Sequence, residues 1–413
     1  LWGIDPHSDY LNPTTWTRDF GLYYTDGVTP AQYRVGGDGL REGVDYHCPM
    51  QIVLTDERDP DAMITDLVRQ WIELNDFEVE PLSVRSHEAA LELFIEGRRK
   101  TRMWYPGQGY RLEMGDPSSA FIYIGEQGLS AWFDYLVFER TGDPEWRQRA
   151  FEQMDFILEG QNTNEDDPNY GVVHTAFSLV DYGPAGRGFN SVDRGNNPGF
   201  KPDLNAHLAR YMLLLWKRVK EKEGIDRRDW HRAATLALDW VLRQQNPDGG
   251  LPQRVLFEPI ESRLGEDWMT TGQDDRVVYK SGERSRSTVS GRALVALWHV
   301  HRLTGDERYR RALERLEDFT LRNVQNHYHY TGNHPDLPPF ELEEASIWGV
   351  AEHWLNRYEE TRDERYLKHA EANASLSLTW WCPRQLSWVD NPTFGASAEQ
   401  QHFLQYSVYC YQN

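Results

Sequence analysis

HRLTGDERYRRALERLEDFTL, residues 301–321, joins a TGD turn to an amphipathic stretch, and it has copies elsewhere in the chain. The copies are FERTGDPEWRQRAFEQMDFIL (138–158), YEETRDERYLKHAEANASLSL (358–378) and, more loosely, EGIDRRDWHRAATLALDWVL (223–242). After each turn, apolar residues recur near i, i+3, i+4 and i+7, which predicts an amphipathic helix. Similarity at an irregular spacing indicates one supersecondary unit that is separated by insertions of variable length.

An apolar-rich stretch precedes each turn and predicts a second helix, so the unit is a helical hairpin. The four stretches are residues 120–138, 203–219, 288–303 and 343–358. Their composition predicts inner helices buried all round, each followed by a half-exposed outer helix. Residues 40–54 and 59–74 suggest an earlier hairpin, and residues 397–411 suggest a further inner helix.

About six inner helices ringed by outer ones predict an all-α fold, an (α/α)6 toroid or barrel of helical hairpins. We expect a single catalytic domain over residues 1–413, in which residues 1–39 contribute to one rim. A superhelical solenoid of hairpins is the alternative. A helix over residues 83–99 has no clear position in either arrangement.

Loop lengths predict where the functional end of the ring lies. The turns from inner to outer helix are short, whereas the connections from outer to inner helix are long. Those connections are residues 75–117, 159–202, 246–286, 323–341 and 379–398. In a ring of hairpins they all lie on one rim, where the inner helices begin. Long loops without regular structure are more often functional than not, so we expect the site at this rim.

The composition narrows the class of ligand. The net charge of −21 argues against a nucleic-acid partner, because no basic footprint is present. The chain has 16 Trp and 21 Tyr, which suits the stacking of sugar rings on aromatic side chains. No apolar run is long enough to span a membrane. We therefore expect a soluble protein with a carbohydrate substrate, and its oligomeric state is not predicted.

Cofactor and compartment signals are few. The sequence has no Walker loop, GxGxxG, GxSxG or HExxH motif, and His327, His329 and His334 have no second cluster near them. We predict neither a metal nor another cofactor. The three cysteines are far apart and leave the compartment open. A secreted or periplasmic protein with a removed signal and a cytoplasmic protein both fit.

Carboxyl groups at the predicted rim are the candidates for catalysis, because glycoside hydrolysis needs two that flank the bond. Glu126, in YIGEQG, and Glu344, in EEASIW, are the predicted acid and base pair, followed by Asp203, Asp19 and Asp275. A helix N-terminus favours the charged form of a carboxyl group, so the acid needs aromatic neighbours that desolvate it. Rim residues predicted to bind substrate are Arg194, Asn197, Trp348 and Trp381.

The hairpin pattern resembles the six-hairpin glycosidase superfamily, which includes glucoamylases, trehalases and unsaturated glucuronyl hydrolases. Related α/α toroids include polysaccharide lyases and sugar epimerases. The segment TWTRD, residues 15–19, is similar to one in glucoamylase-like enzymes, where the Arg and Asp hydrogen-bond the sugar at the non-reducing end. The resemblance implies that Arg18 and Asp19 hold substrate hydroxyls, with Trp16 beside them. The acidic segment that supplies the glucoamylase catalytic acid is not found, so only substrate anchoring carries over.

We therefore predict a glycoside hydrolase that cleaves an oligo- or polysaccharide, with a uronic acid as one option for the sugar. Three alternatives remain open. A polysaccharide lyase would use His174 and Tyr279 for proton transfer and Asn197 to neutralise a uronic-acid carboxylate. A sugar epimerase would use His174 with His353 or His402. The non-enzyme alternative is a helical scaffold that binds glycans.

Overall fold

The computed structural model describes residues 59–74, 87–100, 104–110, 121–178, 188–190, 199–252, 254–255, 287–288, 290–325 and 344–378. Helices dominate these residues. They are α2 (Pro60–Leu74), α3 (His87–Lys100), α4 (Ile124–Thr141), α5 (Pro144–Glu159), α6 (Pro202–Glu223), α7 (Arg228–Gln244), α10 (Gly291–Thr304), α11 (Glu307–Thr320), α12 (Glu344–Thr361) and α13 (Glu364–Leu378), with a π-helical turn, η3 (Leu321–Gln325), after α11.

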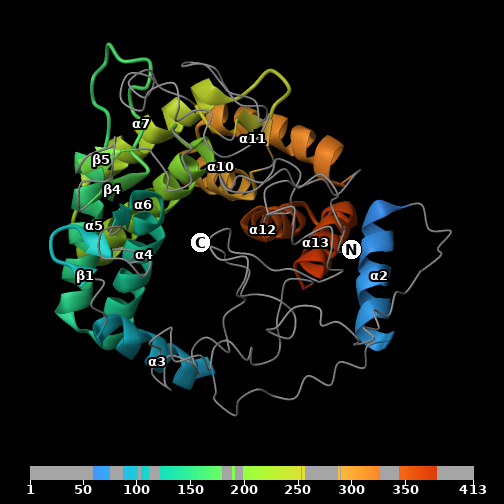
Figure 1. The fold of residues 1–413 in the computed structure, drawn as a ribbon, viewed down its shortest axis with the longest axis horizontal. Coiled ribbons are helices and arrows are strands. Elements are labelled where there is room, and N and C mark those ends of the chain that lie inside the picture. The colour runs from blue at the N-terminus through green and yellow to red at the C-terminus, as the bar shows by residue number, and fades with distance from the viewer. Residues whose placement is uncertain are drawn as a thin grey trace, which may run out of the picture.

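The helices form a ring of hairpins, as the repeat predicted (Figure 1). Inner helix α4 packs against α6, α6 against α10, and α10 against α12. Each packs against its own outer helix, so the complete hairpins among the described residues are α4/α5, α6/α7, α10/α11 and α12/α13. Helix α2 packs on α13, which brings the beginning of the described chain beside its end. The predicted helices at 40–54 and 397–411 lie outside the described residues.

The TGD turn has a structural explanation, which two of the copies share in full. Gly142 has φ 72° and caps α4 in the left-handed region, where glycine has no steric penalty. Asp143 then begins α5 by accepting a hydrogen bond from the Glu145 amide at 3.1 Å. Gly305 and Asp306 repeat this arrangement between α10 and α11. The third copy places Arg362 in the left-handed position with φ 60°, so this turn forms without the glycine.

Short strands tie the ends of outer helices to the starts of inner helices. β3 (Phe121–Tyr123), directly before α4, pairs antiparallel with β4 (Ala176–Ser178), which follows α5 and also pairs with β5 (Gly188–Asn190). β6 (Leu251–Pro252), after α7, pairs antiparallel with β7 (Ser287–Thr288), before α10. The described ends of the connections 159–202 and 246–286 therefore lie beside the starts of inner helices, and the turns at 142–143, 224–227, 305–306 and 362–363 lie at the other ends of the hairpins.

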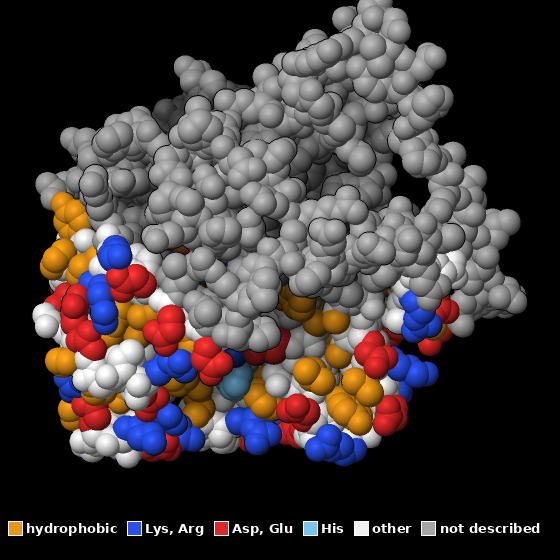
Figure 2. All heavy atoms as spheres, turned by 90° about the horizontal axis from the view of Figure 1, so that it is seen from below, with side chains coloured by type: hydrophobic (Ala, Val, Ile, Leu, Met, Phe, Trp, Pro, Cys, Tyr) orange, Lys and Arg blue, Asp and Glu red, His pale blue; other side chains and the backbone are white. Residues whose placement is uncertain are grey.

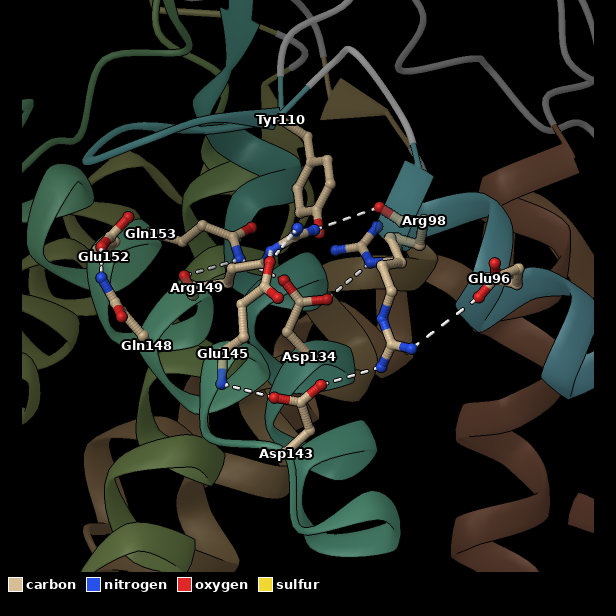
Figure 3. A network of polar contacts seen from close by, with 11 residues as sticks. Glu96, Arg98, Tyr110, Asp134, Asp143, Glu145, Gln148, Arg149, Glu152 and Gln153 are labelled. Carbon is tan, nitrogen blue, oxygen red and sulfur yellow. Dashed lines mark hydrogen bonds and ion pairs between the residues drawn. The ribbon is translucent and has the colours of Figure 1, made fainter.

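Helix α3, which had no predicted position, packs beside α4 through a polar network (Figure 3). Arg98 donates from Nε to Oδ1 of the buried Asp134 at 2.7 Å, and Gln153 donates to Oδ2 of the same carboxylate at 2.8 Å. The guanidinium of Arg98 also lies 3.8 Å from the ring centroid of Tyr110. Tyr110 belongs to β2 (Gly109–Tyr110), which pairs with β1 (Trp104–Tyr105) in a hairpin before α4. Asp134 thus has two partners, which offset part of the cost of burying its charge, although burial still raises its pKa.

The core lies between inner and outer helices. Three aromatics near the starts of the outer helices enter it: Trp146 and Tyr309 are 1% and 2% exposed, and Trp230 is fully buried. On the surface, acidic and basic side chains are interspersed over the described face in Figure 2. Among the described residues, no helix combines the length and apolarity needed to cross a membrane.

Candidate functional site

Two charged residues meet across an intervening helix on the inner side of the ring. Glu126 lies in the first turn of α4, and its Oε1 lies 2.9 Å from Nη1 of Arg292 on α10. Helix α6 lies between α4 and α10 in the ring, and α7 covers its outer side. The ion pair must therefore cross the inner side of α6. Glu126 is 33% exposed there and Arg292 is 26% exposed.

His207, on the helix that this ion pair crosses, completes a first cluster. Its Nε2 lies 3.5 Å from Oε2 of Glu126, and its Nδ1 has no hydrogen-bond partner among the described residues. Burial lowers the pKa of His207, against the opposing effect of the Glu126 carboxylate. Burial also acts to raise the pKa of Glu126, but Arg292 and His207 together outweigh it and bring that pKa to about 2. The cluster is an ionised carboxylate beside an arginine and a neutral imidazole.

A second cluster repeats these residue types one helix further around the ring. Arg210 on α6 donates from Nη2 to Oε1 of Glu352 on α12 at 2.9 Å, and the same Nη2 lies 3.1 Å from Nε2 of His299 on α10. This ion pair crosses α10, whose outer side packs on α11, so it also lies on the inner side. Burial, together with Arg210 and Arg302, lowers the pKa of His299 to about 4.

The composition of the inner helices predicted that they are buried all round, and this prediction is wrong. Side chains on the same faces as the two clusters are exposed. Trp348 and Leu355 on α12 are 39% and 44% exposed, and they share a face with Glu352 because they lie four residues before it and three after it. Tyr211 on α6 packs edge to face on His207, with ring centroids 5.0 Å apart. The inner face therefore combines charged, aromatic and aliphatic groups.

Glycines allow the inner helices to approach closely enough for these contacts. A Cβ on Gly128 of α4 would lie 2.8 Å from Cδ1 of Leu208 on α6. At the next pair of helices, Gly291 of α10 and Gly349 of α12 touch through their backbones, and a Cβ on Gly349 would lie 2.4 Å from the carbonyl carbon of Gly291. At the Gly291–Gly349 contact a larger residue would meet backbone, so these two glycines set the spacing of α10 and α12.

The structure describes the backbone of five of the predicted site residues and the side chains of four of them. Glu126 lies in the first cluster, and Trp348 is exposed on the inner face of α12. Asp203, in the first turn of α6, is 4% exposed and is therefore less accessible than Glu126. His174 packs against Phe200, with ring centroids 5.4 Å apart, and burial lowers its pKa to about 4. Glu344 is the first residue of α12, and its side chain lies outside the described part.

The remaining predicted residues lie outside the described residues and stay predictions: Trp16, Arg18, Asp19, Arg194, Asn197, Asp275, Tyr279 and Trp381. His402, named for the epimerase alternative, also lies outside them. The other histidine of that alternative, His353, is fully buried and its Nε2 contacts Glu317 Oε1 of α11 at 2.7 Å. It joins an inner helix to an outer one and is not exposed on the inner face.

Sequence reasoning missed most of both clusters: His207, Arg210, Arg292, His299 and Glu352. A signal was present, because polar residues recur at helical spacing within otherwise apolar inner helices. His207 and Arg210 are three residues apart in α6, and Arg292 and His299 are seven apart in α10. Within the described part of the chain, no group of three or more His, Cys, Asp or Glu side chains is arranged to hold a metal ion.

Comparisons with known proteins return solved structures only. No protein-family model matches the chain, and no curated protein does. One similar solved structure is a GH76 α-mannanase of Bacteroides thetaiotaomicron, which is 14% identical over 76% of this chain and 81% of that chain, with a TM-score of 0.46. A D-mannose isomerase is 11% identical over 72% of this chain and 70% of that chain, with a TM-score of 0.46. A cellobiose 2-epimerase of Spirochaeta thermophila is 16% identical over 79% of this chain and 75% of that chain, with a TM-score of 0.46. At TM-scores below 0.5 these similarities define neither the family nor the reaction of this chain.

Proposed function

We propose that this protein is a carbohydrate-active enzyme, and specifically a glycoside hydrolase that works on the inner side of the ring. The observation that carries the proposal is the Glu126–Arg292 ion pair across α6, in which the carboxylate is 33% exposed. His207 lies behind it with a side chain that is 10% exposed. The carboxylate is therefore the group of this cluster that a substrate reaches most readily.

The charge state of Glu126 assigns its role in hydrolysis. A glycosidase pair needs one protonated carboxyl group, which donates to the leaving oxygen, and one ionised carboxylate, which activates water or attacks the sugar. Arg292 and His207 bring the pKa of Glu126 to about 2, so Glu126 is the ionised member. It acts as base or nucleophile and not as the acid.

Glu344 remains the proposed acid. It begins α12, the inner helix that packs on α10, and α10 carries Arg292. Trp348 lies one turn further along α12 and offers an exposed aromatic face, on which a sugar ring can stack. An apolar wall of this kind disfavours ionisation of a nearby carboxyl group, as the acid requires. Arg18 and Asp19 of the TWTRD segment are the proposed anchors for substrate hydroxyls.

Product analysis on a panel of neutral and uronic-acid oligosaccharides tests the reaction. A hydrolase increases the number of reducing ends without ultraviolet absorbance, whereas a lyase product absorbs because it gains a double bond. We expect Glu126→Gln to lower kcat by at least about a hundredfold. Glu139→Gln is the matched control, because Glu139 lies on the same helix α4 and pairs with Arg218 of α6 at 2.8 Å, near the other ends of these helices. Hydrolysis that survives in the Glu126→Gln variant would reject Glu126 as base or nucleophile.

A sugar epimerase is the second candidate, and a specific observation favours it. His207 and His299 both carry a lowered pKa and lie in the two clusters on the inner side of the ring. A neutral imidazole can remove a proton at a carbon centre, and the imidazolium that forms can return one after exchange with solvent. An epimerase leaves chain length unchanged and exchanges the substrate hydrogen with solvent. The epimerase replaces the hydrolase proposal if the wild type incorporates deuterium into the sugar and releases no new reducing ends, and if His299→Gln no longer incorporates deuterium.

A further inference from the structure

The second cluster retains hydrogen-bonding capacity that its own ion pair does not use. Nε of Arg210 is buried and has no hydrogen-bond partner among the described residues. Glu352 is 48% exposed, and Arg210 occupies only its Oε1. A partly exposed acceptor therefore lies beside a donor whose bonding is incomplete. Buried polar groups left in this state are costly unless a further molecule satisfies them.

The charge of this cluster is balanced. Arg210 and Glu352 neutralise each other at 2.9 Å. The pKa of His299, at about 4, leaves its imidazole neutral at physiological pH. A carboxylate ligand would compete with Glu352 for the guanidinium and would add an uncompensated negative charge. Neutral hydroxyl groups can accept from and donate to the same side chains without this cost, so the cluster suits a neutral polar ligand.

The second cluster lies further from the long-loop rim than the first. Arg292 is in the first turn of α10, whereas His299 is seven residues further along, which corresponds to about 10 Å of helix. On α12, Leu355 follows Glu352 on the same face and is 44% exposed. The side chain that follows the second cluster on this face is thus apolar and offers no partner for a hydroxyl group.

Tyr211 lies between the two clusters and connects them. Its ring packs on His207 at 5.0 Å, and the guanidinium of Arg210 lies 5.0 Å from its centroid. The charges of both ion pairs act on its hydroxyl group, although burial is the main reason why its pKa is raised. The two clusters are therefore neighbouring parts of one surface.

We propose that Arg210, His299 and Glu352 form a second sugar-binding position, which receives a neutral terminal unit of the substrate. The Glu126 cluster then acts on the linkage between this unit and the next, nearer the long-loop rim. This inference rests on the proposed function for the bond that is cleaved, and it names the substrate class: a neutral chain end, processed one unit at a time. It argues against a uronic acid at the terminal position.

Binding of monosaccharides tests the second position without any turnover. Glucose, mannose, galactose and glucuronate would be titrated by calorimetry into the full-length protein and into Arg210→Lys and Glu352→Gln. We expect at least one neutral sugar to bind more tightly than glucuronate, and its affinity to fall about tenfold to a hundredfold in both variants, because charged hydrogen bonds are lost. Arg218→Lys and Glu139→Gln are the matched controls. They alter a partly exposed ion pair in which Arg218 lies on α6, as Arg210 does, and Glu139 lies on α4. We expect the sugar affinity of these variants to be within about twofold of the wild type.

Glu352→Gln is nearly isosteric and alters a half-exposed residue, so it keeps the test valid if Arg210→Lys does not fold. Preferred binding of glucuronate, or equal affinities in the Glu352 and Glu139 variants, would overturn the second position. If the wild type cleaves oligosaccharides while these results are negative, the hydrolase stands and the second position fails. If no oligosaccharide is cleaved but neutral-sugar binding depends on Glu352, the hydrolase fails and the second position stands.

Discussion

Glu126 of α4 and Arg292 of α10 form a 2.9 Å ion pair across the inner side of α6, with the buried imidazole of His207 beneath it. The ion pair needs α4, α6 and α10 at close spacing. Gly128 allows α4 to approach α6 closely, because it packs against Leu208. The arginine has an electrostatic consequence for the carboxyl group. Without it, burial would raise the pKa of Glu126, because desolvation disfavours the charged form.

Arg292→Gln should therefore shift the pH dependence of activity. The pKa of Glu126 is about 2, and removal of the opposing charge should move it upward past the ordinary value near 4.5. If ionised Glu126 is required, the acid limb of kcat/KM shifts to higher pH by about two units or more. Arg302→Gln, on the same helix α10, is the control and should leave this limb in place. An unshifted limb in Arg292→Gln would separate Glu126 from the reaction, and a carbon-13 titration of the carboxyl group would locate its pKa independently.

The contact between Gly291 and Gly349 gives a prediction about stability. A methyl group on Gly349 would meet the Gly291 backbone at 2.4 Å, so α10 and α12 would have to move apart. We expect Gly349→Ala to lower the free energy of unfolding by about 1–3 kcal/mol, the usual range for overpacking, and to reduce activity. The measurement is urea denaturation.

Gly97→Ala is the matched control for this substitution. Gly97 lies in helix α3, and a Cβ there would meet nothing within 4 Å. Alanine favours helix over glycine, so this variant should gain about 0.5–1 kcal/mol. Equal and small effects at positions 349 and 97 would show that the inner helices are not constrained at the Gly291–Gly349 contact.

The hairpins could be predicted from the sequence because their signals are local. Gly142 and Asp143 specify a left-handed cap and the next helix start within two residues, and the third copy keeps Asp363 although Arg362 replaces glycine. The position of α3 could not be predicted in this way. It depends on the contact between Arg98 and Asp134, which are 36 residues apart, and local patterns carry no information about such pairings.

The candidate site was only partly predictable for a similar reason. Glu126 was found because acidic residues at a helix start are visible in the sequence. His207 and Arg292 lie inside apolar helices, where a lone polar residue usually satisfies a core contact. Their meeting with Glu126 depends on the order of helices around the ring, which places α6 between α4 and α10. The inner face becomes recognisable only when this arrangement is known.

His174 provides a pH-dependent contribution to stability with a defined sign. Burial lowers its pKa from 6.5 to about 4, so the unfolded chain binds more protons than the folded protein between these values. Stability should therefore fall as pH decreases from about 6.5 to 4, by up to about 3 kcal/mol from this residue. His174→Gln cannot titrate and should lose less stability over this window. Thermal melting at several pH values tests this contribution, and identical profiles for variant and wild type would contradict a lowered pKa of the half-buried His174.

The contact between α2 and α13 predicts how the two ends of the described ring hold together. Asp61 of α2 is 6% exposed and pairs with His369 of α13, and Gln325 donates to its Oδ1 at 2.7 Å. Asn373 donates in turn to Oε1 of Gln325 at 2.8 Å. Since the network is buried, removal of its carboxylate leaves several polar groups without a partner.

Asp61→Ala should therefore lower the free energy of unfolding by about 3–5 kcal/mol, whereas Asp66→Ala on the same helix should change it by less than about 1 kcal/mol. Asp66 pairs with Arg69, and both side chains are about half exposed, so solvent screens that ion pair. Hydrogen exchange measures the effect where it arises. In Asp61→Ala, the amides of α2 and α13 should exchange faster than in the wild type. The amides of α4 and α5, which do not contact this network, should exchange more slowly than those of α2 and α13. Uniform acceleration over all helices would mean that α2 unfolds together with the whole ring, and that the contact does not define a separate unit of stability.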